Sequence, residues 1–225
     1  MTDTPCARVD VLIPTFNRGG MLPECLRSIL NQTEQDFRIV IFDDGSTDGS
    51  TDPGVLPPDP RIEVIRGDTN RGIPYARNKL LEAVRAPYAC WQDSDDVAHL
   101  KRLEIMVALL EKTQADVASS HLYFFNGHVA RKHWHRYKVD TGRYAVPDEN
   151  GHPKDYGLPN NLAFATTFFR REVASYKFDL SKPIAEDYDL FRRLIQDGKT
   201  FATCETPLYF ARRHPGRISE VMKNK

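Results

Sequence analysis

The first half of the chain alternates short apolar runs with amphipathic segments. Runs rich in β-branched and aromatic residues predict buried strands at Val9–Ile13, Phe37–Phe42, Ile62–Ile65 and Pro87–Trp91. Apolar residues at i, i+3 and i+4 spacing predict helices at Met21–Leu30, Pro74–Val84 and Leu100–Leu110. Strands that alternate with helices are typical of right-handed βαβ units. We therefore predict an α/β domain with a mostly parallel central sheet flanked by helices.

The second half has a less regular pattern. It predicts strands at Val117–Phe125, Val129–Tyr137 and Ala163–Arg170, the first two forming a hairpin around Asn126-Gly127, and a helix at Asp187–Gln196. Residues 138–161 are rich in glycine and proline, which predicts a long functional loop. The basic residues 211–225 predict a mobile tail. No linker divides the chain, so we predict a single domain with a regular part at about 8–115 and an irregular part at about 116–210.

The composition and charge of the chain argue against several classes of function. The chain has 225 residues, with 31 Lys+Arg and 31 Asp+Glu, so no global positive field attracts nucleic acid. Four cysteines are widely spread without CxxC spacing, which predicts neither a disulfide framework nor a zinc site and favours a reducing cytoplasm. No stretch approaches the roughly 20 apolar residues of a membrane span, and the acidic start lacks signal-peptide features. Peripheral attachment to a membrane stays open.

Polar clusters follow three of the predicted strands. Thr15 and Asn17 follow the first strand, Asp43-Asp44 the second, and Asp93-Ser94-Asp95-Asp96 the fourth. Ligands of parallel sheets bind beyond the carboxyl ends of the strands, where these clusters should meet. The sequence therefore predicts one ligand site built from three loops.

The acidic cluster carries the most specific chemistry. Three carboxylates within four residues repel one another unless a cation lies between them. Mg²⁺ and Mn²⁺ take such oxygen ligands and complete their shells with substrate phosphates and water. The alternative is an N-cap, in which Ser94 or Asp95 begins the helix that contains Leu100–Leu110.

Other motifs each allow two interpretations. Asp44 is either part of a plain turn or an acceptor for a base N–H. Arg71 and Arg77 belong to a helix start that faces an anion, or Arg77 pairs with a carboxylate. Asp187 is a general base on a rigid helix or a residue that the helix dipole favours. His214, beside Arg213, meets a diphosphate or lies in a solvated tail.

Several ligand classes are disfavoured by their missing motifs. His133 and His135 could bind zinc from one face of a strand, but no third ligand stands at a recognisable spacing, so exposed histidines are favoured. The sequence has neither Gly-x-Gly-x-x-Gly nor a Walker loop, which argues against dinucleotide enzymes and P-loop nucleotidases.

Taken together, the motifs resemble those of the inverting family 2 glycosyltransferases with the GT-A (Rossmann-like) fold. The matching segments are Val11–Arg18, Leu26 with Ser28–Thr33, Asp43–Asp48, Asn70–Gly72, Ala76–Asn78, Asp93–Asp96 and Glu186–Asp187, in the order of the family. The resemblance is dense across residues 9–112 and sparse afterwards.

The resemblance implies a role for each matching position. The implied nucleotide-sugar-binding residues are Pro14, Thr15, Asn17, Asp44, Arg71, Arg77, Asp93 and Asp95. The implied ligands of a metal, Mn²⁺ or Mg²⁺, are Asp95, Asp96 and His214, the last by a looser match. Asp187 is the implied general base.

The implied reaction moves a sugar from a nucleotide-diphosphate sugar, with UDP favoured by the family, to an acceptor hydroxyl. The acceptor is a carbohydrate, a lipid-linked molecule or another hydroxyl compound, as in polysaccharide, glycolipid or glycoconjugate synthesis. Residues 8–115 would bind the donor and residues 116–210 the acceptor, with residues 138–161 as an acceptor wall or lid. Two alternatives stay open: a sugar-phosphate nucleotidyltransferase, and a catalytically silent domain that binds a carbohydrate or a partner.

Overall fold

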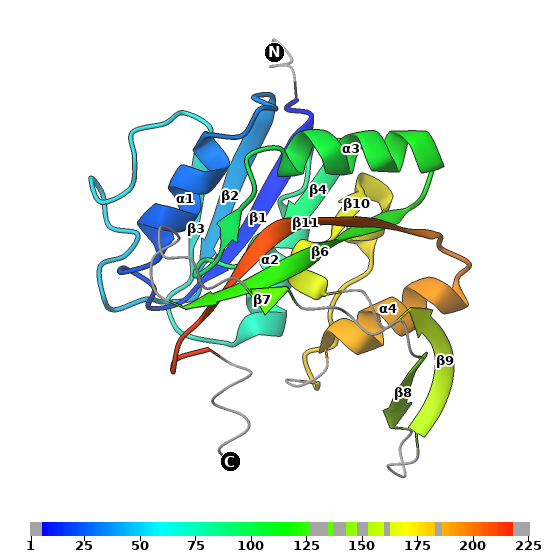
Figure 1. Ribbon diagram of the computed structural model, residues 1–225. Helices are drawn as coiled ribbons and strands as arrows, with labels where there is room; N and C mark the ends of the chain where they lie inside the picture. Colours follow the sequence, from blue (N-terminus) through cyan, green and yellow to red (C-terminus); the bar gives the residue numbers. More distant parts are fainter. Residues whose placement is uncertain are drawn as a thin grey trace, which may run out of the picture.

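The computed structural model describes residues 6–126, 163–182 and 186–217, together with the backbone of three further strands between 135 and 159. The strands of the main sheet are β1 Val9–Thr15, β2 Phe37–Asp43, β3 Ile62–Arg66, β4 Tyr88–Trp91, β5 Val97–Ala98, β6 Val117–Asn126, β7 His135–Arg136, β10 Phe168–Arg170 and β11 Phe201–Arg213. Their spatial order is β3-β2-β1-β4-β10-β6-β11-β5, with β7 paired to β6 (Figure 1). The helices are α1 Leu22–Leu30, α2 Ile73–Glu82, α3 Arg102–Thr113 and α4 Glu186–Gln196.

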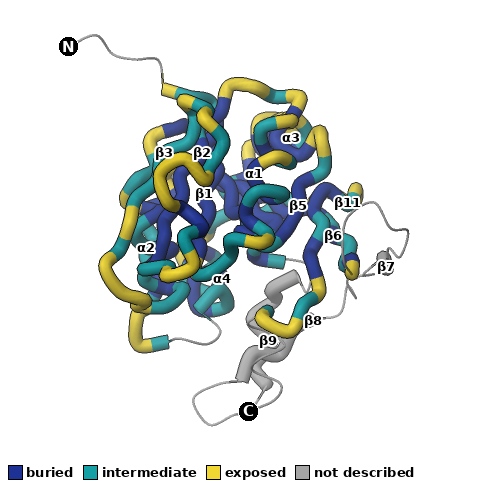
Figure 2. Tube along the Cα trace, turned by 90° about the vertical axis from the view of Figure 1, so that its left-hand side faces the viewer, coloured by how far each residue is buried: buried dark blue, intermediate teal, exposed yellow. Residues whose placement is uncertain are grey.

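The parallel half of the sheet lies between two apolar layers. Strands β3, β2, β1 and β4 run parallel, as the sequence predicts. Alternate residues of β1 enter different layers: Val11 packs with α1 and α3, whereas Leu12 packs with α2 and α4. The buried strands therefore form the middle of an α/β/α arrangement, with exposed residues on the surrounding loops and helix faces (Figure 2). This arrangement confirms the predicted α/β class.

One charged residue interrupts the buried strand β1. The carboxylate of Asp10 is fully buried and accepts hydrogen bonds from Arg38 Nε at 2.8 Å and from the backbone N–H groups of Arg85 at 2.7 Å and Ala86 at 2.9 Å. These bonds satisfy the carboxylate and fix the turn that leads from α2 into β4. Asp10 is therefore a structural anchor of the sheet.

Replacing Asp10 with alanine should lower the free energy of unfolding by about 3–5 kcal/mol, because the half-buried Arg38 guanidinium and two backbone N–H groups lose their acceptor. Glu63→Ala is the matched control, since Glu63 is 38% exposed and bonds the same Arg38 at 2.8 Å. That change should cost less than about 1 kcal/mol. Urea unfolding of both variants measures the difference, and equal costs would contradict the anchoring role.

The second half of the sheet is mixed, and three predictions change there. Only Phe168–Arg170 of the expected strand at 163–170 enters the sheet, as β10, antiparallel to β4 and β6, and a 3₁₀ turn at Phe164–Thr166 precedes it. The expected loop contains two paired antiparallel strands, β8 Arg143–Pro147 and β9 Pro153–Pro159. Residues Ala211–Arg213, expected in the tail, belong to β11, because β11 stays paired to β6 as far as Arg213.

The other predictions for this region are partly testable. Strand β7 pairs antiparallel with β6, as expected of a hairpin, although its turn at Gly127 lies outside the described residues. The side chains of His133 and His135 and the tail beyond residue 217 also lie outside them.

Candidate functional site

Three loops meet at the carboxyl ends of β1, β2 and β4, where the sequence places the polar clusters. The first two are joined by a backbone hydrogen bond from Asp44 N to Thr15 O at 2.9 Å. The third is tied to the first through Arg18, whose Nε lies 3.4 Å from Asp95 Oδ2. The predicted convergence of the three clusters is thus present.

The β1 and β2 loops fix each other through side-chain bonds. Asn17, in the left-handed region at φ 51°, donates its N–H to Ser46 Oγ at 2.9 Å and accepts the Thr47 N–H at 2.9 Å through Oδ1. Gly45 has φ +78°, and a Cβ there would lie 2.7 Å from the backbone carbon of Thr69. The position therefore needs glycine, both for its dihedral angles and for the close approach of the two backbones.

The two carboxylate oxygens of Asp44 differ in their hydrogen bonds. Its Oδ2 accepts the backbone N–H groups of Arg71 at 3.0 Å and Gly72 at 2.8 Å, at the start of α2. Its Oδ1 is buried and has no hydrogen-bond partner among the described residues, and the same holds for the hydroxyl of Thr15. Buried polar atoms rarely stay unpaired. This pair marks a place that is completed by a ligand or by water.

The acidic turn gathers three carboxylates. Asp93, Asp95 and Asp96 each offer an oxygen, and these oxygens all lie within 4.8 Å of one another. Burial, and then the neighbouring Asp95 carboxylate, raises the pKa of Asp93 above its ordinary value. The same two causes raise the pKa of Asp96 well above its ordinary value. Crowded acids of this kind are stabilised by a hard cation, so the donor set fits Mg²⁺ or Mn²⁺.

Strand β11 holds this turn from the other half of the chain. The buried Tyr209 hydroxyl accepts the Asp93 N–H at 3.0 Å, and the Arg212 N–H bonds Asp96 Oδ1 at 2.7 Å. Arg212 Nε also donates to the Asp95 carbonyl at 2.9 Å. The N-cap alternative is wrong, because β5 separates the turn from α3, whose N-cap is Lys101.

Two basic side chains converge on one oxygen of Asp95. His214 Nε2 lies 2.9 Å from Asp95 Oδ2, and Arg18 approaches the same atom. Arg18 also donates from Nη2 to the carbonyl of Gly216 at 3.1 Å. The structure therefore brings His214 to the acidic turn, as expected, and adds Arg18, which the sequence reasoning did not assign.

The remaining expected donor residues are placed as follows. Pro14 is buried within β1, opposite Phe42 of β2. The exposed Arg71 guanidinium lies 3.8 Å over the ring of Tyr75. Arg77 donates from Nη1 to Glu186 Oε1 at 2.5 Å, so the expected alternative of a carboxylate partner is present. Neither arginine side chain bonds Asp44 in the described part of the chain.

Asp187 lies in the first turn of α4, next to Glu186. It is half-buried, and its Oδ1 accepts the N–H of Tyr188 at 2.9 Å. The ion pair of Glu186 with Arg77 brings this helix start to α2 of the donor half. The helix start that carries the Asp187 carboxylate is thereby joined to α2.

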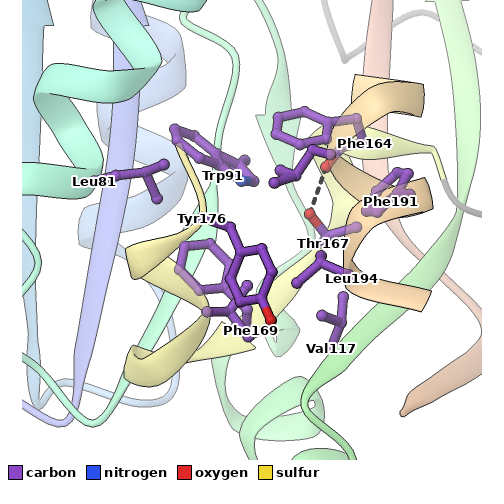
Figure 3. A pocket seen from close by; sticks show the side chains of 11 residues that line it. Leu81, Trp91, Val117, Phe164, Thr167, Phe169, Tyr176, Phe191 and Leu194 are labelled. Carbon is purple, nitrogen blue, oxygen red and sulfur yellow. Dashed lines mark hydrogen bonds between the residues drawn. The ribbon is translucent and has the colours of Figure 1, made fainter. Parts of the chain in front are cut away.

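A cavity lies on the α4 side of the sheet, apart from these carboxylates. Figure 3 shows its lining, which includes Trp91, Phe164, Phe169, Phe191 and Leu194. Only about 10 Å³ is open to the centre of a water molecule, which is about one water in size. This space is a packing gap of the apolar core and not a substrate pocket.

Sequence reasoning missed the residues that brace the acidic turn. Arg18 ends the matching segment Val11–Arg18 but has no role assigned from the sequence, and the sequence pattern does not predict β11. The only signal for Tyr209 and Arg212 is the cluster of aromatic and basic residues at Tyr209–His214, which fits either contact with a diphosphate or a solvated tail.

A family profile and several curated proteins match this chain. The profile described as "Glycosyl transferase family 2" matches residues 10–178. Glycosyltransferase GlyA of Streptococcus pneumoniae is 27% identical over 228 residues, covering 97% of this chain and 32% of GlyA. Succinoglycan biosynthesis protein ExoO of Rhizobium meliloti is 25% identical, covering 96% of this chain and 63% of ExoO. The chain thus spans about a third to two thirds of these relatives.

Solved structures share the fold. S. aureus TarS 1–349 in complex with UDP superposes with a TM-score of 0.67 at 22% identity, over 96% of this chain and 63% of the TarS 1–349 chain. The mannosyltransferase PcManGT of Pyrobaculum calidifontis, in complex with GDP-Man and Mn²⁺, gives 0.62 at 19% identity, over 92% and 57%. The expected GT-A fold is confirmed. None of the helices in the described residues is long and apolar enough to cross a bilayer.

Proposed function

Because this chain belongs to glycosyl transferase family 2, we propose that it transfers a sugar from a nucleotide-diphosphate sugar to an acceptor hydroxyl. Inversion at the anomeric carbon and UDP as the donor nucleotide are parts of the proposal. The observation that carries it is the acidic turn, with three carboxylate oxygens within 4.8 Å at the ligand edge of the sheet.

The metal part of the proposal rests on the charge of this turn. Asp95 and Asp96 would hold Mn²⁺ or Mg²⁺, with Asp93 and His214 beside them. When bound, the cation supplies positive charge to the diphosphate that leaves. Asp93 is half-buried and Asp96 is buried, and both have raised pKa values, which supports a shared cation partner rather than three separately solvated acids.

The nucleotide part rests on Asp44 and Thr15. Asp44 Oδ2 is already occupied by two backbone N–H groups, so Oδ1 remains as a single acceptor. A uracil ring presents one ring N–H, whereas guanine presents two adjacent donors that suit both oxygens of a carboxylate. The arrangement therefore favours uracil. The Thr15 hydroxyl would bond a neighbouring carbonyl of the base.

The catalytic part rests on Asp187. Its carboxylate would accept the proton of the acceptor hydroxyl while that oxygen attacks the anomeric carbon. The bond from this carbon to the diphosphate breaks, and its electron pair goes to the phosphate oxygen. Arg18 and His214 lie at Asp95 and would face the negative charge that develops there.

The acceptor and the pathway are proposed at a coarser level. Relatives named for succinoglycan and teichoic acid synthesis support a polysaccharide or other glycoconjugate acceptor, carbohydrate or lipid-linked. All four cysteines are free thiols, which fits the expected cytoplasmic location, and attachment to a membrane surface remains part of the proposal.

A donor screen tests the proposed function. UDP with Mn²⁺ should raise the melting temperature more than GDP or ADP with Mn²⁺, since ligands that bind the native state stabilise it. A UDP-sugar should then release UDP in the presence of acceptor extracts. Release of pyrophosphate from a nucleoside triphosphate and a sugar phosphate would instead identify a nucleotidyltransferase. If no donor raised the melting temperature or reacted, the silent-domain alternative would stand.

A further inference from the structure

An ion pair joins the two halves of the domain beside the proposed base. Arg77 of α2 donates from Nη1 to Glu186 of α4 at 2.5 Å, across 109 residues of sequence. The two side chains are only 10% and 12% exposed. A pair that is so enclosed is less screened by solvent than a surface pair, and losing one partner leaves the other buried and uncompensated.

The surroundings of Arg77 hold its charge in place. Its guanidinium carbon lies 4.1 Å from the centre of the Phe164 ring and 5.6 Å from that of Phe178. Its Nε is buried without a hydrogen-bond partner among the described residues. The rings leave the guanidinium little freedom to turn. The orientation of its contact with Glu186 is therefore fixed, unlike that of a flexible surface arginine.

Arg77 also acts on the acidic turn. Burial raises the pKa of Asp93, and the charge of Arg77 opposes that rise. Burial likewise raises the pKa of Glu186, and Arg77 opposes that rise as well. The guanidinium carbon also lies 5.9 Å from the centre of the ring of Trp91, which ends the strand that leads into the acidic turn, so Arg77 contacts this strand end as well as the start of α4.

The first turn of α4 is held at two points, the contact of Glu186 with Arg77 and that of Asp189 with three cations. The buried Asp189 accepts bonds from Lys182, Arg192 and Arg193, which lower its pKa to about 2. The Asp187 side chain, by contrast, bonds only the adjacent Tyr188 N–H among the described residues. The direction of Asp187 thus follows the backbone of the turn that Glu186 begins.

We propose that Arg77 is a positioning residue that, by holding Glu186, fixes the first turn of α4 and aims Asp187 at the donor site. The proposal rests on the proposed function, in which Asp187 is the base. This positioning role of Arg77 is different from direct binding of the nucleotide.

Two variants and their combination test this role. Arg77→Met and Glu186→Gln should each lower kcat about 10- to 100-fold, because small misplacements of a reacting group have effects of that size. The Kd for UDP with Mn²⁺ should stay within about twofold. The double variant should be no slower than the slower single variant, since both remove one interaction. Arg77→Lys, which keeps the charge, should recover part of the loss.

The matched control is Lys79→Met on the same helix, which removes a surface pair with Glu82 at 2.8 Å. It should leave kcat and Kd near the wild-type values. A weaker UDP Kd with unchanged kcat in Arg77→Met would overturn the positioning role in favour of direct donor binding. Additive losses in the double variant would also overturn it.

Hydrogen exchange separates this proposal from the assignment of the base. In Arg77→Met, amides of residues 186–190 should exchange at least about tenfold faster than in the wild type or in Lys79→Met, because local opening becomes easier. This readout needs neither donor nor acceptor. Full activity of Asp187→Asn would remove the base assignment but leave this measurement valid, whereas unchanged exchange would reject the positioning role.

Discussion

Replacing Asp187 with asparagine is expected to slow sugar transfer by about 10² to 10⁴, the range that a general base contributes. Asparagine keeps the size of the side chain and can still accept the Tyr188 N–H, which Asp187 accepts at 2.9 Å. It cannot take a proton from the acceptor. Binding of the donor should therefore be unchanged, and the loss should fall on kcat rather than on the donor Kd.

The control for this change is Asp197→Asn, just beyond the end of the same helix. Asp197 is exposed and accepts the Tyr176 hydroxyl at 2.8 Å, a bond that asparagine can replace. Steady-state rates of UDP release, with calorimetric donor affinities, measure both variants. Turnover of Asp187→Asn within about threefold of the control would exclude Asp187 as the base.

Replacing Asp95 with asparagine is expected to remove the effect of Mn²⁺ on nucleotide binding. Mutation of a residue that hydrogen-bonds a metal ligand typically lowers metal affinity by about 10- to 100-fold. Loss of a ligand itself should therefore lower the metal affinity by at least about 100-fold. The negative charge is lost where His214 and Arg18 converge, so these side chains should also lose their common ion-pair partner. Calorimetry of UDP binding with and without Mn²⁺ measures the effect.

Asp68→Asn provides the comparison, because Asp68 is an exposed carboxylate in the turn after β3. The Mn²⁺ dependence of UDP binding should be the same in this variant as in the wild type. If the wild-type protein binds UDP equally with and without Mn²⁺, the acidic turn is not a metal site for the donor.

The donor side of the molecule was predictable because its determinants are local. Each strand of the parallel half is a short apolar run, and each polar cluster lies at its carboxyl end, as at Asp43-Asp44, where Asp43 is the last residue of β2. Parallel pairing then brings the clusters together by topology alone. Even so, Pro14 and Thr15 lie within β1 and not after it, because both stay in register with β2.

The contacts that β11 makes with the acidic turn could not be predicted in the same way. Strand β11 contains Pro207 and register shifts on either side of it, so its sequence does not show a clean alternation of apolar and polar residues. Its strand character comes from pairing with β6, more than 80 residues earlier. Contacts such as Arg212 with Asp96 depend on that distant pairing, which no local pattern encodes.

For the acidic turn and for Arg77, the sequence allows two interpretations, and only tertiary contacts decide between them. The acidic turn looks like a helix start in sequence, and only the short strand β5 shows that α3 begins later. Arg77 fits both a donor role and an ion pair in sequence, and the partner Glu186 lies in the other half of the chain. Local residue types limited the possibilities, and long-range packing selected among them.

The dependence of the acidic turn on β11 sets an order for biosynthesis. Residues 93–96 leave the ribosome long before Tyr209, Arg212 and His214, which lie 116 to 119 residues from their partners in the turn. Until those residues emerge, the acidic turn has Arg18 available as an ion-pair partner but lacks its bonds with Tyr209, Arg212 and His214. A nascent chain can therefore form its parallel strands before β11 exists, but its acidic turn gains the contacts from β11 only once that strand has been made.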